Sequence, residues 1–221
     1  MKNLRLYSKD LYRIFIDIAR IVSRINQDEF GINRMEELYS IANSRRWTDS
    51  EAEEMENLDP VVGFFLLDIR SLLIFIVVFM DKLARFLSLI IDKKGKNLKN
   101  RSFKSFKADL AKLRGKEIEE FGQLISDNTK WFKKVKDWRD DFVVHHPGAS
   151  GAMIFRNGKP YAALTTRKKI SRDPKYIIMN SQAKDISMDE IDKILLQLRK
   201  LLIVLDEYLC SHVNILPVEV K

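Results

Sequence analysis

The chain has 221 residues, of which 46% are hydrophobic and 32% are charged, a balance typical of a packed soluble protein rather than of a disordered segment. Its single cysteine, Cys210, excludes an internal disulfide, so nothing points to an oxidising compartment. The first residues lack the apolar stretch of a signal peptide, and we therefore expect a cytoplasmic protein. The net charge of +8 favours an anionic partner, nucleic acid before a membrane surface.

Apolar residues recur at helical spacing from the start of the chain. The first predicted helix covers residues 4–25, and a break at Gly31 precedes a shorter helix through residues 35–41. Thr48 and Glu51 have the spacing of a capping box, which predicts that a new helix begins there. Six acidic residues and no basic residue then occupy positions 49–59. This run indicates a solvated helix face or, alternatively, an acidic strip that folds back over a basic groove.

The most apolar stretch of the chain lies at residues 72–80. We expect Pro60 to open its helix, which runs to about residue 92 and is buried nearly all round in a bundle. Charged residues flank the stretch, and the uncharged run is shorter than the about 20 residues that a bilayer requires. We therefore expect no membrane insertion. The surplus of apolar residues over 61–91 favours a dimer.

Residues 93–101 read as a polar linker, after which Ser102 is expected to cap a helix that Gly115 interrupts. The apolar pattern then resumes and, after a further cap at 127–129, leads into a helix over residues 131–145. Residues 151–182 change to strand periodicity, with a hairpin turn around Asn157 and Gly158 and a third strand at 176–179. A second capping box at 187–190 opens the last helix.

These patterns predict a mainly α protein, an antiparallel helical bundle with a small β insertion before its last helix. The insertion, a hairpin or three strands at about residues 151–182, is too small to fold alone and should pack on the helices. We expect residues 1–221 to form a single domain, because the half before the linker would lack partners for its apolar helix.

Basic residues concentrate in two segments. Residues 93–116 hold ten basic residues and one acid, and residues 156–175 hold seven basic residues and one acid. Clustered cations bind phosphates without regard to sequence, so RNA is an expected partner; the alternative is a solvated basic surface. The residues that we expect to bind nucleic acid are Lys96, Lys99, Arg101, Lys104, Arg167, Lys168 and Lys169.

The helix predicted over residues 131–145 carries the residues best suited to chemistry. An apolar stripe of Trp131, Val135, Trp138 and Phe142 is expected to anchor it. Arg139 lies at the edge of this stripe, and His145 and His146 follow near a helix end set by Pro147. A permanent cation beside a group that titrates near neutrality suits phosphodiester cleavage. The histidine transfers the proton, the arginine neutralises the transition-state charge, and RNA supplies its own 2′-hydroxyl nucleophile without a metal.

The run Arg-Asp-Asp-Phe-Val-Val-His from Arg139 to His145 resembles the R-x(4–6)-H signature of HEPN domains, and His146 also satisfies the spacing. The resemblance implies an all-α bundle, often dimeric, of the kind found in toxin–antitoxin and abortive-infection systems, in CRISPR effectors and in RNA processing. Active members are metal-independent ribonucleases in which two motifs face each other across a homodimer, and an antitoxin or other protein can be a partner. By this resemblance Arg139 stabilises the transition state, His145 or His146 is the acid and base, and Asp140 orients the arginine or the histidine.

Other readings of the same residues stand beside this one. Arg139 could simply pair with Asp140 or another acid, and His145 could cap a helix C-terminus. Other HEPN members lack activity, so the alternative function is a non-catalytic helical module that binds RNA, a nucleotide or a protein through a basic face. Cys210 and His212 give no metal-ligand spacing with the two adjacent histidines, so we expect no metal and no cofactor. Cys210 itself is expected to be a buried, inert thiol.

Overall fold

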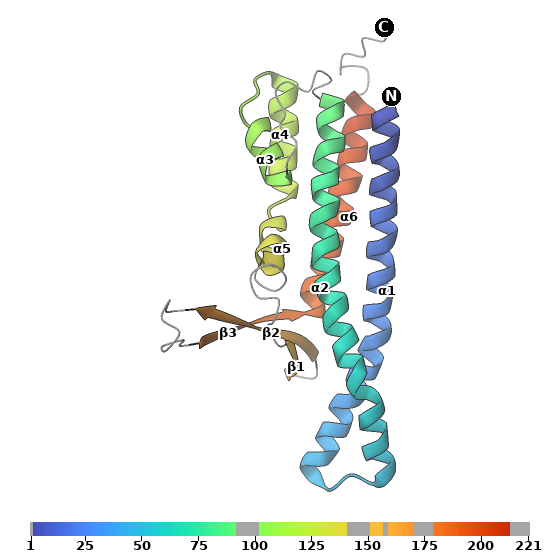
Figure 1. Cartoon of the computed structure of the whole chain (residues 1–221). Coiled ribbons are helices and arrows are strands. Elements are labelled where there is room, and N and C mark those ends of the chain that lie inside the picture. Colours follow the sequence, from blue (N-terminus) through green and yellow to red (C-terminus); the bar gives the residue numbers. More distant parts are fainter. Residues whose placement is uncertain (1, 92–101, 141–150, 157–158, 170–178, 213–221) are drawn as a thin grey trace. The chain divides into compact units, whose positions relative to one another are not determined.

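The structure, a computed structural model, describes residues 2–91, 102–140, 151–156, 159–169 and 179–212, with side chains described for 8–91, 102–140 and 186–212. The chain is mainly helical, as predicted (Figure 1). Its helices are α1 (Lys2–Ser44), α2 (Asp49–Ile91), α3 (Phe103–Leu110), α4 (Lys116–Asn128), α5 (Phe132–Arg139) and α6 (Met188–His212). The strands β1 (Gly151–Arg156), β2 (Lys159–Lys169) and β3 (Met179–Ser187) come between α5 and α6 in the chain.

The chain divides into two compact units. Unit 1 consists of Met1–Asp17, Phe75–Val135 and Asp192–Lys221. Unit 2 consists of Ile18–Ile74 and Lys136–Ile191. Each unit therefore takes in a part of α1 and a part of α2, because both helices run continuously past the division.

The break predicted at Gly31 is wrong, because α1 is one helix from Lys2 to Ser44. Buried residues continue at helical spacing on both sides of the glycine, and the helix gains more from this packing than glycine costs it. A Cβ atom at Gly31 would lie 3.2 Å from Cγ1 of Val61 on α2. The glycine thus permits a close approach of the two helices in unit 2 instead of ending one of them.

The capping box that opens α2 is confirmed. The backbone N–H of Thr48 donates to Oε2 of Glu51 over 2.8 Å, and the N–H of Glu51 donates back to Oγ1 of Thr48 over 3.3 Å. The start predicted at Pro60 is wrong, since this proline lies inside α2. The helix continues past it because residues on both sides of the proline pack against α1. This core in unit 2 consists of Met35, Leu38 and Met55, with the partly buried Ile41, Trp47, Leu58 and Val62 around them.

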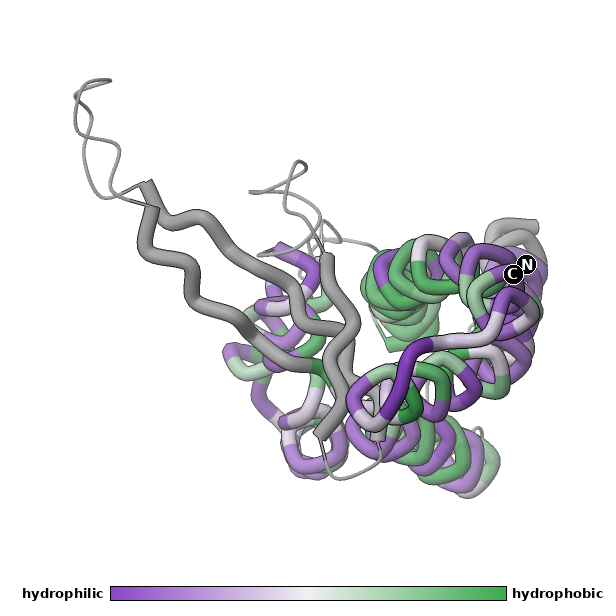
Figure 2. The backbone as a smooth tube through the Cα atoms, turned by 90° about the horizontal axis from the view of Figure 1, so that it is seen from below, coloured by the Kyte–Doolittle hydropathy of each residue, from purple (hydrophilic) through white to green (hydrophobic). Residues whose placement is uncertain are grey.

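The apolar stretch at residues 72–80 is mostly buried, but its predicted all-round burial is wrong on one side, where Ile74 and Val78 are 37% and 39% exposed. Phe64 and Leu67 in unit 2 are 62% and 57% exposed, so one side of this helix faces solvent. The helix is long and apolar enough by composition to cross a membrane, with a mean hydropathy of 2.5 in its most apolar window, and 44% of that window is buried. A core helix of a soluble protein passes the same test. Figure 2 shows hydrophobic and hydrophilic residues alternating along the helices, as amphipathic packing requires.

Ion pairs fix the antiparallel register of α1 and α2 within each unit. In unit 1, Nζ of Lys82 lies 3.0 Å from Oδ2 of Asp10. In unit 2, Arg34 contacts Glu54, with Nε 2.7 Å from Oε1. A third pair, between Arg24 and Asp68, also lies in unit 2 and is described with the site. Residue numbers rise along α1 while those of the partners fall along α2, so the helices are antiparallel, as predicted for the bundle.

In unit 1, α3 begins at the cap predicted from Ser102, whose Oγ accepts the N–H of Ser105 over 3.2 Å. The N–H of Phe103 donates to Oδ1 of Asp81 on α2 over 2.8 Å, which attaches this helix end to α2. Phe103 and Phe106 are buried, with ring centroids 6.0 Å apart, so neither offers a stacking face for a base. Gly115, with a φ of 127°, separates α3 from α4 and uses a backbone region that other residues rarely adopt.

The strands form a three-stranded antiparallel sheet in the order β1-β2-β3. β1 pairs with the first half of β2, from Gly151 opposite Leu164 to Arg156 opposite Lys159. β3 pairs with β2 along its length, from Tyr161 opposite Ser187 to Lys169 opposite Met179. Asn157, Gly158 and residues 176–178 lie outside the described residues, so β3 begins at the last residue of the strand predicted there.

The last helix, α6, begins at the second predicted capping box. The N–H of Ser187 donates to Oε2 of Glu190 over 3.2 Å, and the N–H of Glu190 donates to Oγ of Ser187 over the same distance. Its core residues in unit 1 are Ile194, Leu198, Leu201 and Leu205. The expected burial of Cys210 is wrong: the thiol is exposed on α6, on the side of the helix away from the buried Leu201 and Leu205.

Candidate functional site

Helix α5 places Arg139 at its last residue. Phe132, Val135 and Trp138 are its buried residues, so Phe132 takes the core position that we predicted for Trp131. Trp131 precedes the helix, is only partly buried, and donates from its indole Nε1 to the carbonyl of Asn128 over 2.8 Å. The buried face of α5 thus fixes the helix axis, and Arg139 follows the buried Trp138 at the boundary predicted for it.

The guanidinium of Arg139 is held in place by an ion pair. Its Nη2 lies 2.6 Å from Oδ1 of Asp140, and the two side chains are 25% and 30% exposed. Its Nε atom is buried and has no hydrogen-bond partner among the residues that the structure describes. A buried N–H without a partner costs about 1–3 kcal/mol, and Nε remains available to donate to an oxygen such as that of a phosphate group.

The two histidines lie outside the described residues, as do Asp141 and Phe142. The predicted extension of the helix from Arg139 to His145 belongs to the same range. Within the described chain, Arg139 has the neighbour that the resemblance implies, because Asp140 directly follows it and contacts it. The same contact is the one expected if the arginine were merely paired with an acid.

The predicted nucleic-acid residues fall into three groups. Lys96, Lys99 and Arg101 lie outside the described residues. Lys104 is exposed on α3 in unit 1. Arg167, Lys168 and Lys169 are the last residues of β2 in unit 2, where they pair along the backbone with Ser181, Asn180 and Met179. Among the described residues of unit 1, Lys104 is therefore the one member of the predicted nucleic-acid-binding set.

Some basic residues near α3 and α4 have structural partners. Lys112 lies 2.8 Å from Oδ1 of Asp109, and Lys130 lies 3.0 Å from Oδ1 of Asp127. Lys107 is partly buried and donates to the hydroxyl of Thr129 over 3.0 Å. Burial and the nearby charge of Lys130 lower the pKa of Lys107. Other basic side chains of this region are exposed, namely Lys104, Arg114, Lys116, Lys133 and Lys134.

The acidic run at the start of α2 is a solvated helix face that also contacts α1 and the turn. Glu51 pairs with Arg45 over 2.6 Å and Glu54 pairs with Arg34 over 2.7 Å. The bonds from Arg45 and then from the Thr48 backbone lower the pKa of Glu51 to about 2. The other four acids of the run are exposed, namely Asp49, Glu53, Glu56 and Asp59. Arg45 and Arg34 belong to the α1–α2 hairpin itself. This favours the predicted solvated helix face over an acidic strip that folds back over a basic groove.

A bidentate ion pair between α1 and α2 was missed at the sequence level. Nε and Nη2 of Arg24 donate to the two carboxylate oxygens of Asp68 over 2.7 and 2.6 Å. Asp68 is only 6% exposed. Burial and the charge of Asp68 raise the pKa of nearby Asp28. The signal in the sequence is Asp68, an acid among apolar residues. From the sequence alone it is interpreted as one of the charges that flank the buried stretch.

Within the described ranges, no group of three or more His, Cys, Asp or Glu side chains could hold a metal ion. His212 stacks on Tyr208 with ring centroids 4.1 Å apart, and its Nδ1 lies 2.9 Å from the carbonyl of Tyr208. The side chain of His212 therefore contacts its own helix, at the end of α6. Comparison of the chain with family models, with curated proteins and with solved structures finds no match.

Proposed function

We propose that this protein is a HEPN-type, metal-independent endoribonuclease whose catalytic residues are Arg139 and His145 or His146. The observation that carries the proposal is the state of Arg139: one guanidinium nitrogen is held by Asp140, and the buried Nε has no partner among the described residues. An arginine that is positioned but not saturated suits transition-state stabilisation, because its fixed dipoles need no reorganisation when charge develops.

The chemistry follows from the residue types. A histidine removes the proton of the RNA 2′-hydroxyl, which attacks the adjacent phosphorus, and a histidine returns a proton to the departing 5′-oxygen. Arg139 neutralises the charge that develops on the phosphoryl oxygens, and Asp140 keeps the guanidinium in place. The mainly helical fold supports this assignment, as a HEPN-like single domain over residues 1–221 with its β insertion at about 151–182.

The partners follow the same proposal. RNA is the substrate, and a second copy of the chain would bring the second Arg–His motif to a shared site. The exposed Phe64 and Leu67 on α2 support self-association, because large apolar side chains in water favour burial against a partner. A cytoplasmic setting in toxin–antitoxin or abortive-infection systems, with an antitoxin or other protein partner and without membrane insertion, belongs to the same proposal.

The test is cleavage of mixed RNA by the full chain in excess EDTA. We expect cleavage that leaves 2′,3′-cyclic phosphate ends, and a loss of about 100-fold or more in Arg139→Ala. His145→Ala and His146→Ala identify the acting histidine. Arg199→Ala, an exposed residue of α6, is the matched control and should cleave like the wild type. Intact RNA with the wild type, or equal cleavage by a folded Arg139→Ala variant, would contradict the proposal.

A second candidate function is a non-catalytic module that binds RNA, a nucleotide or a protein through basic residues. The observation that favours it is the exposure of Lys104, Arg114 and Lys116 around α3 and α4. Binding of labelled RNA that weakens steeply with salt, while the RNA stays whole, would select this function. Reversing Lys104 and Lys116 to Glu together should then lower the salt slope by about two units, because each phosphate contact contributes about one.

A further inference from the structure

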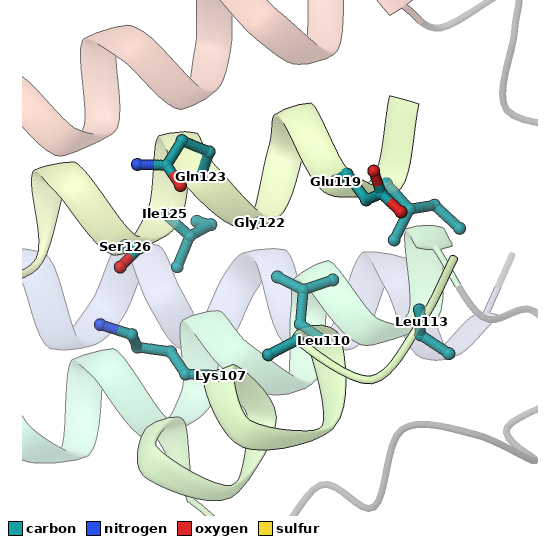
Figure 3. A pocket seen from close by; sticks show the side chains of 10 residues that line it. Lys107, Leu110, Leu113, Glu119, Gly122, Gln123, Ile125 and Ser126 are labelled. Carbon is teal, nitrogen blue, oxygen red and sulfur yellow. The ribbon is translucent and has the colours of Figure 1, made fainter. Parts of the chain in front are cut away.

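A hollow lies between α3 and α4 in unit 1 (Figure 3). Its volume is about 320 Å³, at the lower end of the range for small-molecule sites. The lining residues are Lys107, Leu110, Ala111, Leu113, Ile118, Glu119, Gly122, Gln123, Ile125 and Ser126.

One end of the hollow is polar and cationic. Lys107 and Ser126 lie at this end, and the amine of Lys107 points toward the Ser126 side chain (Figure 3). The amine donates to Oγ1 of Thr129 over 3.0 Å, and that hydroxyl donates in turn to the carbonyl of Ile125 over 2.6 Å. A lysine amine has three donors, and among the described residues this bond is the one hydrogen bond that Lys107 makes.

Among the described residues, no acidic side chain forms an ion pair with Lys107. Its hydrogen-bond partner is a neutral hydroxyl, and Lys130, whose charge acts on it, is itself paired with Asp127. Burial and Lys130 both lower the pKa of Lys107, which means that the protonated amine is held at a disadvantage. An anion at this end would remove that disadvantage.

Most of the remaining wall is apolar, with Gln123 and Glu119 as its polar side chains. Leu110 and Ile125 are buried, and Leu113 and Ile118 are partly buried beside them. Gly122 contributes no side chain, and a Cβ there would lie 3.7 Å from Cγ of Leu110, so the glycine keeps the hollow open. Glu119 lies at the opposite end from Lys107 (Figure 3), which orients an anionic group toward the lysine and away from the glutamate.

We propose that this hollow binds a small, unbranched monocarboxylate, with its carboxylate on Lys107 and Ser126 and its chain along Leu110 and Leu113. The carboxylate would accept the spare donors of the lysine amine, and the methylene groups would replace water on the leucine side chains. Arg139 is not among the residues that line the hollow, so the inference does not depend on the proposed nuclease activity.

The test is isothermal titration of the full chain with the sodium salts of acetate, butyrate and hexanoate at constant ionic strength. We expect affinity to rise about fourfold for each added methylene, as burial of a CH₂ group predicts. Inorganic phosphate and neutral 1-hexanol are the comparison ligands, and each should bind at least tenfold more weakly than hexanoate. Equal binding of phosphate, or of 1-hexanol, would overturn the proposal, because charge alone or apolar contact alone would then suffice.

Variants separate the two ends of the site. Lys107→Met should lower hexanoate affinity at least tenfold, whereas Lys112→Met should not, because Lys112 is 74% exposed and pairs with Asp109. Gly122→Leu, which fills the hollow, should abolish hexanoate binding. It tests the site independently if the lysine variant does not fold. Unchanged affinity in a folded Lys107→Met or Gly122→Leu variant would overturn the assignment. Arg139→Ala should bind hexanoate like the wild type, whatever its effect on RNA.

Discussion

At the scale of single residues, the ion pair of Arg24 with Asp68 is the most consequential contact that the structure describes in unit 2. The Asp68 side chain is 9% exposed, whereas the Arg24 side chain is 53% exposed. Removing the arginine would therefore leave a buried charge without its partner, which is more unfavourable than removing both groups. The pair holds α1 against α2 at one register, because its two hydrogen bonds require both side chains at a fixed height.

We expect Arg24→Met to lower the free energy of unfolding at neutral pH, because Asp68 would keep a buried charge without its partner. The double variant Arg24→Met with Asp68→Leu should recover at least half of that loss, because no buried charge remains. Urea denaturation followed by circular dichroism measures both. A double variant as unstable as the sum of its two single variants would show that the pair does not act as a unit.

The carboxyl of Asp28 gives a pH dependence of stability with a definite sign. Burial and the charge of Asp68 raise its pKa, so the folded state binds this proton more tightly than the unfolded state does. Stability from this group is therefore present below its ordinary pKa and is lost as pH rises through the raised value. Asp28→Asn should have a higher melting temperature than the wild type at pH 7 and an equal one near pH 3.

The control for this prediction is Asp192→Asn, since Asp192 is exposed on α6. It should change the melting temperature little at either pH. Thermal unfolding across the range between pH 3 and 7 makes the comparison, and a stabilisation by Asp28→Asn that is the same at both ends would contradict the titration account.

At the scale of elements, the two glycines of the α1–α2 hairpin in unit 2 have opposite roles. A Cβ at Gly31 would lie 3.2 Å from Val61, whereas a Cβ at Gly63 would meet nothing within 4 Å. Both residues lie within helices, where glycine is less favourable than alanine by about 0.5–1 kcal/mol. Gly31 is therefore kept for close packing, and Gly63 is an unfavourable residue without a packing role in this unit.

We expect Gly63→Ala to raise the free energy of unfolding by about 0.5–1 kcal/mol, because only helix propensity changes. Gly31→Leu should lower it by about 1–3 kcal/mol through overpacking against α2. Chemical denaturation of the two variants beside the wild type measures both changes. If Gly31→Leu were as stable as the wild type, the close approach of the two helices would not depend on this glycine.

At the scale of the whole molecule, the exposed side of α2 is the surface on which the proposed self-association rests. Phe64 and Leu67 lie three residues apart and therefore share a face of the helix. Apolar side chains this exposed favour burial between two copies of the chain, which the proposed function requires. The exposed basic side chains belong to the other proposed contact, which is with RNA.

We expect the wild type to sediment as a dimer and Leu67→Glu as a monomer, because a charge at this position would be buried without a partner. Phe30→Glu is the matched control: Phe30 is 80% exposed on α1 and lies in the same unit. It should sediment like the wild type in analytical ultracentrifugation. A monomeric wild type, or a dimeric Leu67→Glu variant, would contradict the assignment of α2 to a dimer interface.

The site could be anticipated only in part from the sequence. The neighbourhood of Arg139 with Asp140 follows from their adjacency, and the buried Val135 and Trp138 follow from helical spacing. The partnerless Nε could not be foreseen, since it depends on which atoms surround the last turn of α5. The hollow beside Lys107 was likewise hidden, because Lys107 and Ser126 come from different helices and look like ordinary polar residues in the sequence.

Features that depend on near neighbours along the chain could be predicted from the sequence. The mainly helical class, the capping boxes at Thr48 and Ser187, and the cap at Ser102 follow from spacings of three or four residues. Tertiary contacts determine instead that Gly31 does not break α1, that Pro60 does not begin α2, and which side of α2 faces solvent. The reason is energetic: local propensities amount to about 1–3 kcal/mol at a glycine or proline, and packing between helices outweighs them.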